Sequence, residues 1–340
     1  MPDPRRVAVI QPLPGIGDMI WHLPHIRAVA RWFGRPVTLV AKPRSAADEL
    51  FSGEQTIEDV LWLDRNPERR RGGHDGVGGF LRLVASLRQH AFDAVVVMHH
   101  SRMLAAATFA ARVRLRYGYG FGIQRLFLNQ PPFLPASTLA LHPYEQATAW
   151  LAAASIPLEQ VEPSLAVSDA RRIAARQKLG AASEPLVAVG IGTSEPYKQW
   201  GLERFVELSN ALFDAGWPRL VLAGGQAEAS LAEAIRDRLG DRASLAIGWK
   251  LGDLAALLAE SAFYVGNDTG VMNLAGAVGI RTYALFGATP PFYHSSAIVA
   301  VLPPDGRTDI ATGMASITTA AVLEAIRLDR GGISPAYVLS

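Results

Sequence analysis

The feature that most constrains the fold is an alternation of short apolar runs with helix-length segments, repeated in both halves of the 340-residue chain. The apolar runs have the length and the β-branched composition of strands, and turn residues bound them. In the first half the predicted strands are Val7–Ile10, Val37–Ala41, Ile57–Leu63 and Ala94–Met98, and the predicted helices are Asp18–Phe33, Asp48–Phe51 and Phe80–Gln89. Strands that alternate with helices predict a parallel sheet covered on both faces.

The alternation restarts after a candidate linker. A predicted helix, Tyr144–Ala154, leads into the extended segment Val161–Ser168. Beyond it the predicted strands are 186–189, 219–223, 244–247, 262–265 and 282–286, and the predicted helices are 202–215, 227–239, 251–260 and 271–278. We therefore expect an α/β protein of two Rossmann-like domains, residues 1–165 and 166–340. A last helix, about 318–328, is expected by analogy to pack back on the first domain.

Composition excludes several classes of protein. With 49% hydrophobic and 19% charged residues, the chain can form a large core, and disorder is not expected. A net charge of +2 does not favour a nucleic-acid partner. The absence of cysteine excludes disulfides and thiolate chemistry, and fits a cytoplasmic protein. No apolar run approaches about 18 residues, so no membrane span is predicted, while peripheral contact with a membrane stays open.

Ligands of parallel sheets bind beyond the carboxyl ends of the strands, so the loops there carry the candidate sites. The loop after the first strand contains Gly15, Gly17 and Asp18; the glycines permit close approach of a ligand. Asp18 is either the N-cap of the following helix or a reactive carboxylate. The loop lacks the third glycine of a dinucleotide fingerprint, which argues against hydride transfer, and it has no Gly-Lys-Ser/Thr of a phosphate-binding loop.

Two further features of the first half belong to the same edge. His99 and His100 end the fourth strand, and adjacent strand residues point to opposite faces, so we expect at most one of them at the ligand edge. The Arg65 and 69–71 cluster, which includes Arg69 and Arg70, is either a solvated loop or a contact for an anionic acceptor.

The second half has two loops suited to a phosphorylated ligand. After the strand at 186–189, Thr193, Ser194 and Lys198 combine hydroxyls with a cation just before a helix, although an ordinary glycine-rich turn explains this spacing too. After the strand at 262–265, Asp268, Thr269 and Gly270 open a helix whose free amides favour a diphosphate. Asp268 is alternatively only the helix N-cap. The loop 286–291 is expected to wall the same pocket.

In order and spacing, these loops resemble those of the bacterial heptosyltransferases, the enzymes of lipopolysaccharide inner-core assembly. The resemblance covers most of the chain and lies in the segments Gly15–Pro24, Thr193–Trp200, Gly266–Ala275 and Ala284–Pro290. Two positions depart from the family pattern. Asn273 stands where the family usually has histidine, and Gln11-Pro-Leu-Pro14 replaces a lead that often contains a basic residue.

The resemblance implies a GT-B architecture: two facing Rossmann-like parallel-sheet domains with the active site in the cleft between them. The first domain would hold a glycan acceptor, such as lipopolysaccharide core, through Gly15, Gly17, His99, Arg69 and Arg70. The second would hold a nucleotide-diphosphate sugar resembling ADP-heptose through Thr193, Ser194, Lys198, Asp268, Thr269, Gly270 and Asn273. Asp18 would be the general base.

The resemblance also implies inverting transfer without a cofactor or metal, and the sequence contains no Asp-x-Asp motif for a divalent ion. It places the enzyme in the cytoplasm, with contact at the inner membrane left open. Two other functions stay open: a sugar-nucleotide epimerase or hydrolase of similar fold, and a nucleotide-sugar-binding protein that has lost catalysis, as Asn273 would suggest.

Overall fold

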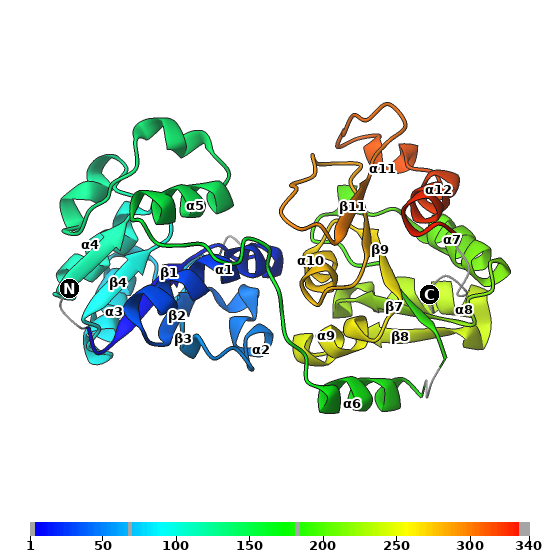
Figure 1. Cartoon of the computed structure of the whole chain (residues 1–340), viewed down its shortest axis with the longest axis horizontal. Helices are drawn as coiled ribbons and strands as arrows, with labels where there is room; N and C mark the ends of the chain where they lie inside the picture. The colour runs from blue at the N-terminus through cyan, green and yellow to red at the C-terminus, as the bar shows by residue number, and fades with distance from the viewer. Residues whose placement is uncertain (1–3, 67–69, 181–183, 333–340) are drawn as a thin grey trace. The chain divides into compact units, whose positions relative to one another are not determined.

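The computed structural model describes residues 4–66, 70–180 and 184–332. The chain divides into two compact units after Pro163. Each unit is a parallel β-sheet with helices packed against it, and Figure 1 shows the two sheets with their helices. The α/β fold of two parallel-sheet domains predicted from the sequence is confirmed.

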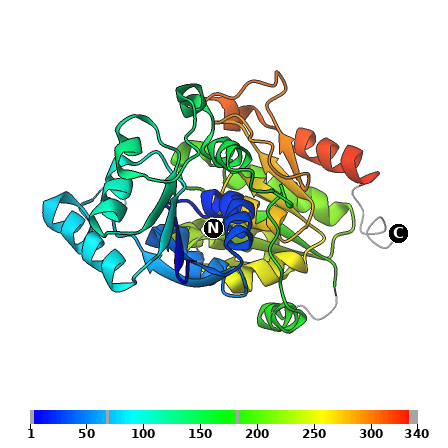
Figure 2. The same ribbon diagram turned by 60° about the vertical axis from the view of Figure 1, so that its left-hand side comes forward.

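The first unit contains a five-stranded sheet in the order β3-β2-β1-β4-β5, with every pair parallel. Its central strands are buried on both faces, which explains their uninterrupted runs of apolar residues. The strands are β1 (Val7–Gln11), β2 (Val37–Ala41), β3 (Ile57–Trp62), β4 (Ala94–Val97) and β5 (Leu115–Gly118). Figure 2 shows this sheet with its helices from a second direction.

The helices of the first unit are α1 (Ile16–Phe33), α2 (Ala47–Leu50), α3 (Gly76–Gln89), α4 (Arg102–Ala110) and α5 (Pro143–Ala153), with short 3₁₀ helices η1 (Pro43–Ser45), η3 (Gly122–Phe127) and η4 (Ala136–Ala140). Leu83 and Leu87 of α3 and Leu104 of α4 share one apolar cluster with Ile10 and Val97 of the sheet. The two helices therefore form one layer over one face of the sheet. Helix α1 packs against α5 and β1.

The second unit contains a six-stranded parallel sheet in the order β11-β10-β9-β6-β7-β8. Its strands are β6 (Leu186–Gly190), β7 (Arg219–Gly224), β8 (Ala243–Ile247), β9 (Phe263–Asn267), β10 (Thr282–Leu285) and β11 (Ile298–Val301). Its helices are α6 (Asp169–Leu179), α7 (Leu202–Asp214), α8 (Ala229–Leu239), α9 (Leu251–Ala259), α10 (Gly270–Ala277), α11 (Gly313–Ser316) and α12 (Thr319–Arg330), with 3₁₀ helices η5 (Pro196–Lys198), η6 (Gln226–Glu228) and η7 (Gly240–Arg242).

The last helix, α12, packs on elements of the second unit, namely α7, β10 and β11. Asp329 fixes it there, because its carboxylate pairs with Arg281 and accepts a hydrogen bond of 2.8 Å from the hydroxyl of Tyr283. Val322 and Ile326 of the same helix are fully buried in the core of this unit. These contacts bind the end of the described chain to the unit that contains β10.

Both sheets follow the doubly wound order, in which the chain reverses direction across the sheet beside its first strand. The reversal lies between β1 and β4 in the first unit and between β6 and β9 in the second. Loops diverge at such a switch point, and the space outside its carboxyl edge is where these folds bind ligands. Within the described residues, no helix is both long and apolar enough to cross a membrane.

Candidate functional site

At the switch point of the first unit, the loop after β1 holds the carboxylate of Asp18 against a glycine. The Gly15 amide donates a hydrogen bond of 3.1 Å to Asp18 Oδ2. A Cβ on Gly15 would lie 2.6 Å from the same oxygen, so only glycine leaves the carboxylate its place. Helix α1 begins at Ile16, with Gly15 as its N-cap and Asp18 as its third residue. Asp18 is therefore not the N-cap that its position in the sequence had suggested.

Burial raises the pKa of Asp18, and the hydrogen bond from Gly15 offsets only part of that effect. One turn further along α1, His22 Nδ1 donates to the Asp18 carbonyl oxygen over 2.7 Å. Burial lowers the pKa of His22 to about 4, so this imidazole is neutral near pH 7. A carboxylate with a raised pKa accepts a proton more readily than an exposed aspartate does.

The loop after β4 carries His99 and His100 in an arrangement that the sequence did not predict. Their rings stack, with centroids 4.1 Å apart, whereas adjacent strand residues were expected on opposite faces. The expectation was wrong because β4 ends at Val97, so the alternation of a strand no longer applies to these residues. The His99 Nδ1 accepts a hydrogen bond of 3.0 Å from the Ser101 amide.

That hydrogen bond fixes the tautomer of His99. Because Nδ1 accepts, the proton of the neutral ring is on Nε2, which is then a donor. Burial, followed by the neighbouring His100, lowers the pKa of His99 to about 4. The loop is itself held in place, because buried Gln124 donates to the His99 carbonyl oxygen over 2.7 Å.

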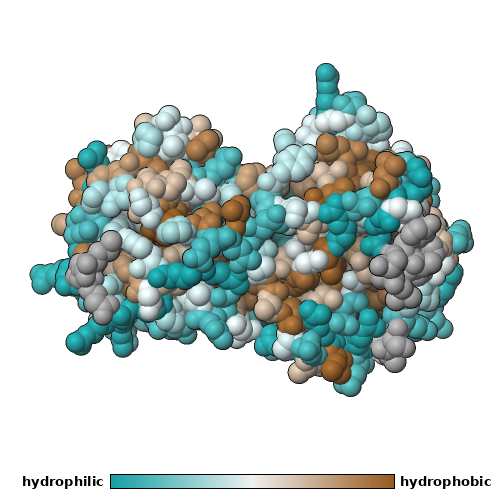
Figure 3. Space-filling view, in the orientation of Figure 1, coloured by the Kyte–Doolittle hydropathy of each residue, from teal (hydrophilic) through white to brown (hydrophobic). Residues whose placement is uncertain are grey.

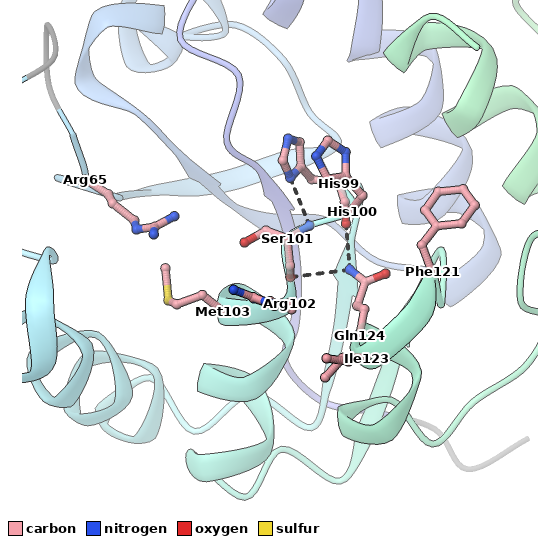
Figure 4. A pocket seen from close by; sticks show the side chains of 9 residues that line it. All are labelled: Arg65, His99, His100, Ser101, Arg102, Met103, Phe121, Ile123 and Gln124. Atoms are coloured by element: carbon pink, nitrogen blue, oxygen red, sulfur yellow. Dashed lines mark hydrogen bonds between the residues drawn. The ribbon is translucent and has the colours of Figure 1, made fainter. Parts of the chain in front are cut away.

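A pocket of about 400 Å³ opens beside this loop. Figure 4 shows the side chains that line it. Its walls combine cations, the two stacked histidines and apolar side chains. They are formed by Arg65, His99, His100, Ser101, Arg102, Met103, Phe121, Ile123 and Gln124. Such walls suit a ligand with polar and anionic groups attached to an apolar or ring-shaped body.

The residues predicted for the acceptor side are distributed unevenly around this pocket. His99 lines it, whereas Gly15 and Gly17 lie at the start of α1 and are not among its lining residues. Arg70 is exposed and does not line it either, and Arg69 falls outside the described residues. The cation of that cluster that does line the pocket is Arg65, which pairs with Asp75 over 3.5 Å.

Sequence reasoning missed Lys42, which follows β2 at the same edge. Its pKa is lowered by burial and by the charge of Arg65, and Lys42 in turn contributes to lowering the pKa of His99. The available signal was its place directly after a buried strand and before a proline. The edge of the first sheet thus gathers positive side chains near His99.

At the switch point of the second unit, Lys198 and Asp268 form an ion pair of 2.5 Å. Lys198 belongs to η5 in the loop after β6, and Asp268 directly follows β9. The Thr289 hydroxyl, from the loop after β10, donates to the same Asp268 oxygen over 3.1 Å. Three loops that are distant in sequence therefore meet at one carboxylate, and both charged side chains are more than four-fifths buried.

Asn267, the last residue of β9, ties the loop after β6 to the sheet. Its fully buried amide donates to the carbonyl oxygens of Ile191 and Gly192 and to Gln199 Oε1, over 3.1 to 3.3 Å. Its Oδ1 has no hydrogen-bond partner within the described part of the chain. The loop that carries Lys198 is thus fixed before any ligand arrives.

Glycine at the facing positions of β6 and β9 makes room for this arrangement. Gly190 pairs with Gly266, and a Cβ on Gly190 would lie 1.7 Å from the Tyr264 hydroxyl. That hydroxyl is buried close to Thr269, although neither hydroxyl has a hydrogen bond of ordinary geometry. Two buried hydroxyls without such bonds, those of Tyr264 and Thr269, therefore lie at the start of α10.

The remaining residues predicted to bind the donor lie in the loop after β6 and at the start of α10. The Thr193 hydroxyl closes its own turn by donating to the Glu195 carbonyl oxygen over 2.7 Å, and Ser194 is exposed. Helix α10 begins at Gly270 with Thr269 as its N-cap, so Asp268 is not the cap that the sequence allowed. Asn273 is buried, and its amide donates to the Thr269 carbonyl oxygen over 3.0 Å.

No group of three or more histidine or acidic side chains that could hold a metal ion occurs among the residues the structure describes. The first unit thus presents a carboxylate, neutral histidines and a cationic pocket. The second presents a lysine and the amino end of a helix. Proton transfer from a hydroxyl suits the first set, and a phosphorylated ligand suits the second.

Comparison with known proteins gives a consistent result. The family model of glycosyltransferase family 9 (heptosyltransferase) matches residues 80–298. Lipopolysaccharide heptosyltransferase 2 of Escherichia coli K12 is 26% identical over 282 residues, which cover 73% of this chain and 80% of that protein. Lipooligosaccharide heptosyltransferase 2 of Haemophilus influenzae is 27% identical over 68% of this chain and 72% of that protein.

Solved structures support the same fold. That of E. coli ADP-heptose lps heptosyltransferase II has a TM-score of 0.76 at 21% identity, with 98% of each chain covered. That of E. coli heptosyltransferase WaaC with ADP-2-deoxy-2-fluoro heptose has a TM-score of 0.74 at 19% identity, with 95% of this chain and 99% of that chain covered. UDP-GlcNAc 2-epimerase from Neisseria meningitidis reaches 0.51 at 13% identity, with 98% of this chain and 93% of that chain covered. At these identities the structures establish the GT-B fold class, which transferases and epimerases share.

Proposed function

The chain belongs to glycosyltransferase family 9 (heptosyltransferase) and is a glycosyltransferase; from this premise we propose that it transfers heptose from an ADP-heptose-like donor to a glycan acceptor of the lipopolysaccharide-core type. The relatives are named for lipopolysaccharide or lipooligosaccharide heptosyl transfer, and one solved relative contains an ADP-heptose analogue. The observation that carries the proposal is the Lys198–Asp268 pair at the amino end of α10.

The donor diphosphate would bind at this pair. Lys198 supplies the positive charge, and the first amides of α10 supply hydrogen-bond donors. The Thr269 side chain, at the N-cap, does not occupy them. Thr193, Ser194, Thr269 and Gly270 lie in the same two loops and would complete the phosphate contacts. Asp268 holds Lys198 in place, and we propose that it also contacts the sugar.

The acceptor would be activated by the first unit. Asp18 would take the proton from an acceptor hydroxyl while the hydroxyl oxygen forms a bond to the anomeric carbon. The bond from that carbon to the diphosphate breaks in the same displacement, and the nucleotide diphosphate leaves with the bonding electron pair. A single displacement inverts the configuration at the anomeric carbon.

We further propose that the leaving diphosphate is stabilised without a metal ion. Lys198 and the amides of Thr269 and Gly270 are fixed donors, which stabilise developing charge without reorganisation during the reaction. His99 Nε2–H, Gly15, Gly17 and the arginines of the first unit would orient the acceptor. Among these, His99 and Arg65 have direct support, because both line the pocket.

The test is transfer of heptose from ADP-heptose to a heptose-deficient lipopolysaccharide core, with and without EDTA. The proposal expects a product of inverted anomeric configuration by NMR and a rate that the chelator does not change. The matched control is Lys198→Ala, which should lose donor binding in calorimetry. Retained configuration, or activity that returns only with added divalent ions, would contradict the proposal.

Two other functions are separated by the same assay. A sugar-nucleotide epimerase or hydrolase would convert the donor when no acceptor is present. Because the fold is also similar to that of UDP-GlcNAc 2-epimerase, the assay must include the donor alone. A protein that has lost catalysis would bind the nucleotide without turnover. Asn273 favours this second alternative only if the missing cation is essential, because asparagine cannot become positively charged.

A further inference from the structure

The segment 76–144 of the first unit is almost free of negative charge. Residues 76–144 contain seven arginines and a single acidic residue, Asp93. The Asp93 carboxylate accepts hydrogen bonds from the backbone amides of Arg5 and Arg6, so even this charge is occupied. Because the whole chain carries only +2, the positive charge here is concentrated well above the average.

This charge lies over elements that pack side by side. Helix α3 contacts α4, and α4 contacts η3. The inner sides of α3 and α4 share one core cluster with the sheet, so their other sides form an outer surface. Figure 4 shows Ile123 and Gln124 of η3 beside the first turn of α4, which carries Arg102 and Met103. We call the outer surface of α3, α4 and η3, together with the exposed Arg112 and Arg114 of the turn that follows α4, the arginine face.

Large apolar side chains project from the same face. On α3, Val77 and Leu81 are 80% and 60% exposed and lie one turn apart. On α4, Phe109 is 53% exposed. On η3, Ile123 and Leu126 are three residues apart, which in a 3₁₀ helix places them on one side, and they are 56% and 75% exposed.

The arginines stand among these apolar groups. Arg116 lies over the Phe109 ring at 5.3 Å, and Arg125 lies over the Phe133 ring at 4.8 Å. Arg114 and Arg125 are exposed. The space-filling view in Figure 3 shows apolar side chains reaching the surface of both units amid polar ones, so exposed apolar groups alone do not distinguish this face. The absence of acidic side chains among them does.

We propose that the arginine face docks on a bilayer that contains anionic phospholipids. Aliphatic side chains enter the boundary between headgroups and acyl chains, while arginines bind the phosphates, as at other interfacial protein surfaces. Exposed aliphatic groups contribute little to binding a nucleic-acid backbone, which favours lipid over a soluble polyanion. An anionic bilayer matches both the charge and the apolar groups.

The arginine face adjoins the pocket, which connects docking with access of the acceptor. This connection rests on the proposed function. Arg102 and Ile123 belong both to the arginine face and to the wall of the pocket that contains His99. A lipid-linked glycan that emerges from the docked bilayer would therefore reach the pocket without leaving the surface. Docking itself requires neither the donor nor turnover, so its test is independent of the transferase activity.

The test is co-sedimentation of the full chain with vesicles of phosphatidylcholine alone or with 30% phosphatidylglycerol. We expect binding to the anionic vesicles only. Arg114→Gln with Arg125→Gln should weaken it about 25-fold, at about fivefold for each arginine near an anionic surface. Leu81→Ser with Leu126→Ser should weaken it at least tenfold.

The matched control comes from the loop 303–312 of the second unit. Arg307 and Ile310 are exposed there as well, but Asp305 and Asp309 flank them. Arg307→Gln with Ile310→Ser should leave vesicle binding unchanged. Unchanged thermal melting of every variant shows that the fold is intact.

Three results would overturn the proposal. One is equal binding to both kinds of vesicle or to neither. The second is an equal loss in the control variant. The third is binding that vanishes with the arginines but ignores the leucines and is matched by duplex DNA, because this would identify the face as a site for a soluble polyanion.

Discussion

The carboxyl edges of the two sheets have the same topology but opposite electrostatic states. In the second unit, Lys198 is paired with Asp268, and Thr289 completes the contacts of that carboxylate. In the first unit, Asp18 is held by a backbone amide, and burial raises its pKa. The Lys198–Asp268 pair combines a cation and an anion in one contact, whereas burial favours the protonated form of the Asp18 carboxyl. The same fold thus provides a lysine and a helix amino end at one edge, and a carboxylate with a raised pKa at the other.

Asp18→Asn should break this comparison most strongly. The amide keeps the shape and can accept the Gly15 hydrogen bond, but it cannot take a proton. We expect turnover to fall about 100-fold or more, with donor affinity unchanged. Steady-state kinetics and nucleotide calorimetry measure the two quantities. A variant that retains its turnover would exclude Asp18 as the base.

Lys198→Ala should lower donor affinity, the quantity that Asp18→Asn leaves unchanged. Loss of a charge-assisted contact to phosphate should weaken nucleotide affinity about 10- to 100-fold. Because the change also leaves Asp268 without its cation, Asp268→Asn in the same chain is the control for repulsion between that carboxylate and the diphosphate. If calorimetry shows full affinity in the single variant, the donor site lies elsewhere.

Gly15→Ala tests how the first edge positions its carboxylate. The added Cβ would lie 2.6 Å from Asp18 Oδ2, so the side chain must rotate away from its place. We expect turnover to fall about tenfold, since small displacements of a reacting group cost that much or more. Gly53→Ala is the matched control, because nothing lies within 4 Å of the Cβ it would add. Equal kinetics in the two variants would mean that the position of Asp18 is not limiting.

Thr289→Val removes one hydrogen bond from Asp268 and leaves its ion pair with Lys198. The expected effect is smaller, about a three- to tenfold loss of donor affinity, in line with one hydrogen bond to a charged group. Thr289→Ser keeps the hydroxyl and should restore the affinity in the same titration. A loss that serine does not restore would point to packing of the threonine methyl group.

The smallest expected effect is on the pH dependence of stability, and it tests the same contrast between the two sheet edges. Because the folded-state pKa of Asp18 is raised, the folded protein binds this proton more tightly than the unfolded chain does. Its contribution to stability is therefore present at acid pH and is lost as pH rises through the raised pKa. Asp18→Asn should accordingly melt at a higher temperature than the natural chain at pH 7, with little difference below the ordinary aspartate pKa. A melting difference that does not change with pH would be evidence against this account.

Much of the fold could be predicted from the sequence, because buried parallel strands leave an unmistakable apolar signal. The strand 37–41 has the predicted ends, and the other predicted strands agree within a few residues. The strand β5 was missed because Leu115-Arg-Tyr-Gly118 is short and contains a charge. Helix α6 was missed because its exposed face leaves Ala175 as its buried residue, so it lacks an apolar stripe.

The site was less predictable, for physical reasons that particular residues illustrate. Lys198 and Asp268 were each identified from loop chemistry, but nothing in the sequence shows that residues 70 positions apart form an ion pair. The tautomer of His99 depends on the backbone path at Ser101. Lys42 has an ordinary sequence context, and its importance comes only from strand order, which places it near His99.

The uneven distribution of acidic residues has a consequence for how the first unit meets its surroundings. Residues 76–144 carry a strong positive excess, whereas the rest of the first unit, residues 1–75 and 145–163, is slightly negative overall. Such an arrangement experiences a torque in the field of a charged plane, and rotation requires no contact. At low ionic strength the field extends about 30 Å, against about 8 Å in physiological salt. The first unit would therefore approach an anionic surface already turned, and salt would shorten the distance over which it can do so.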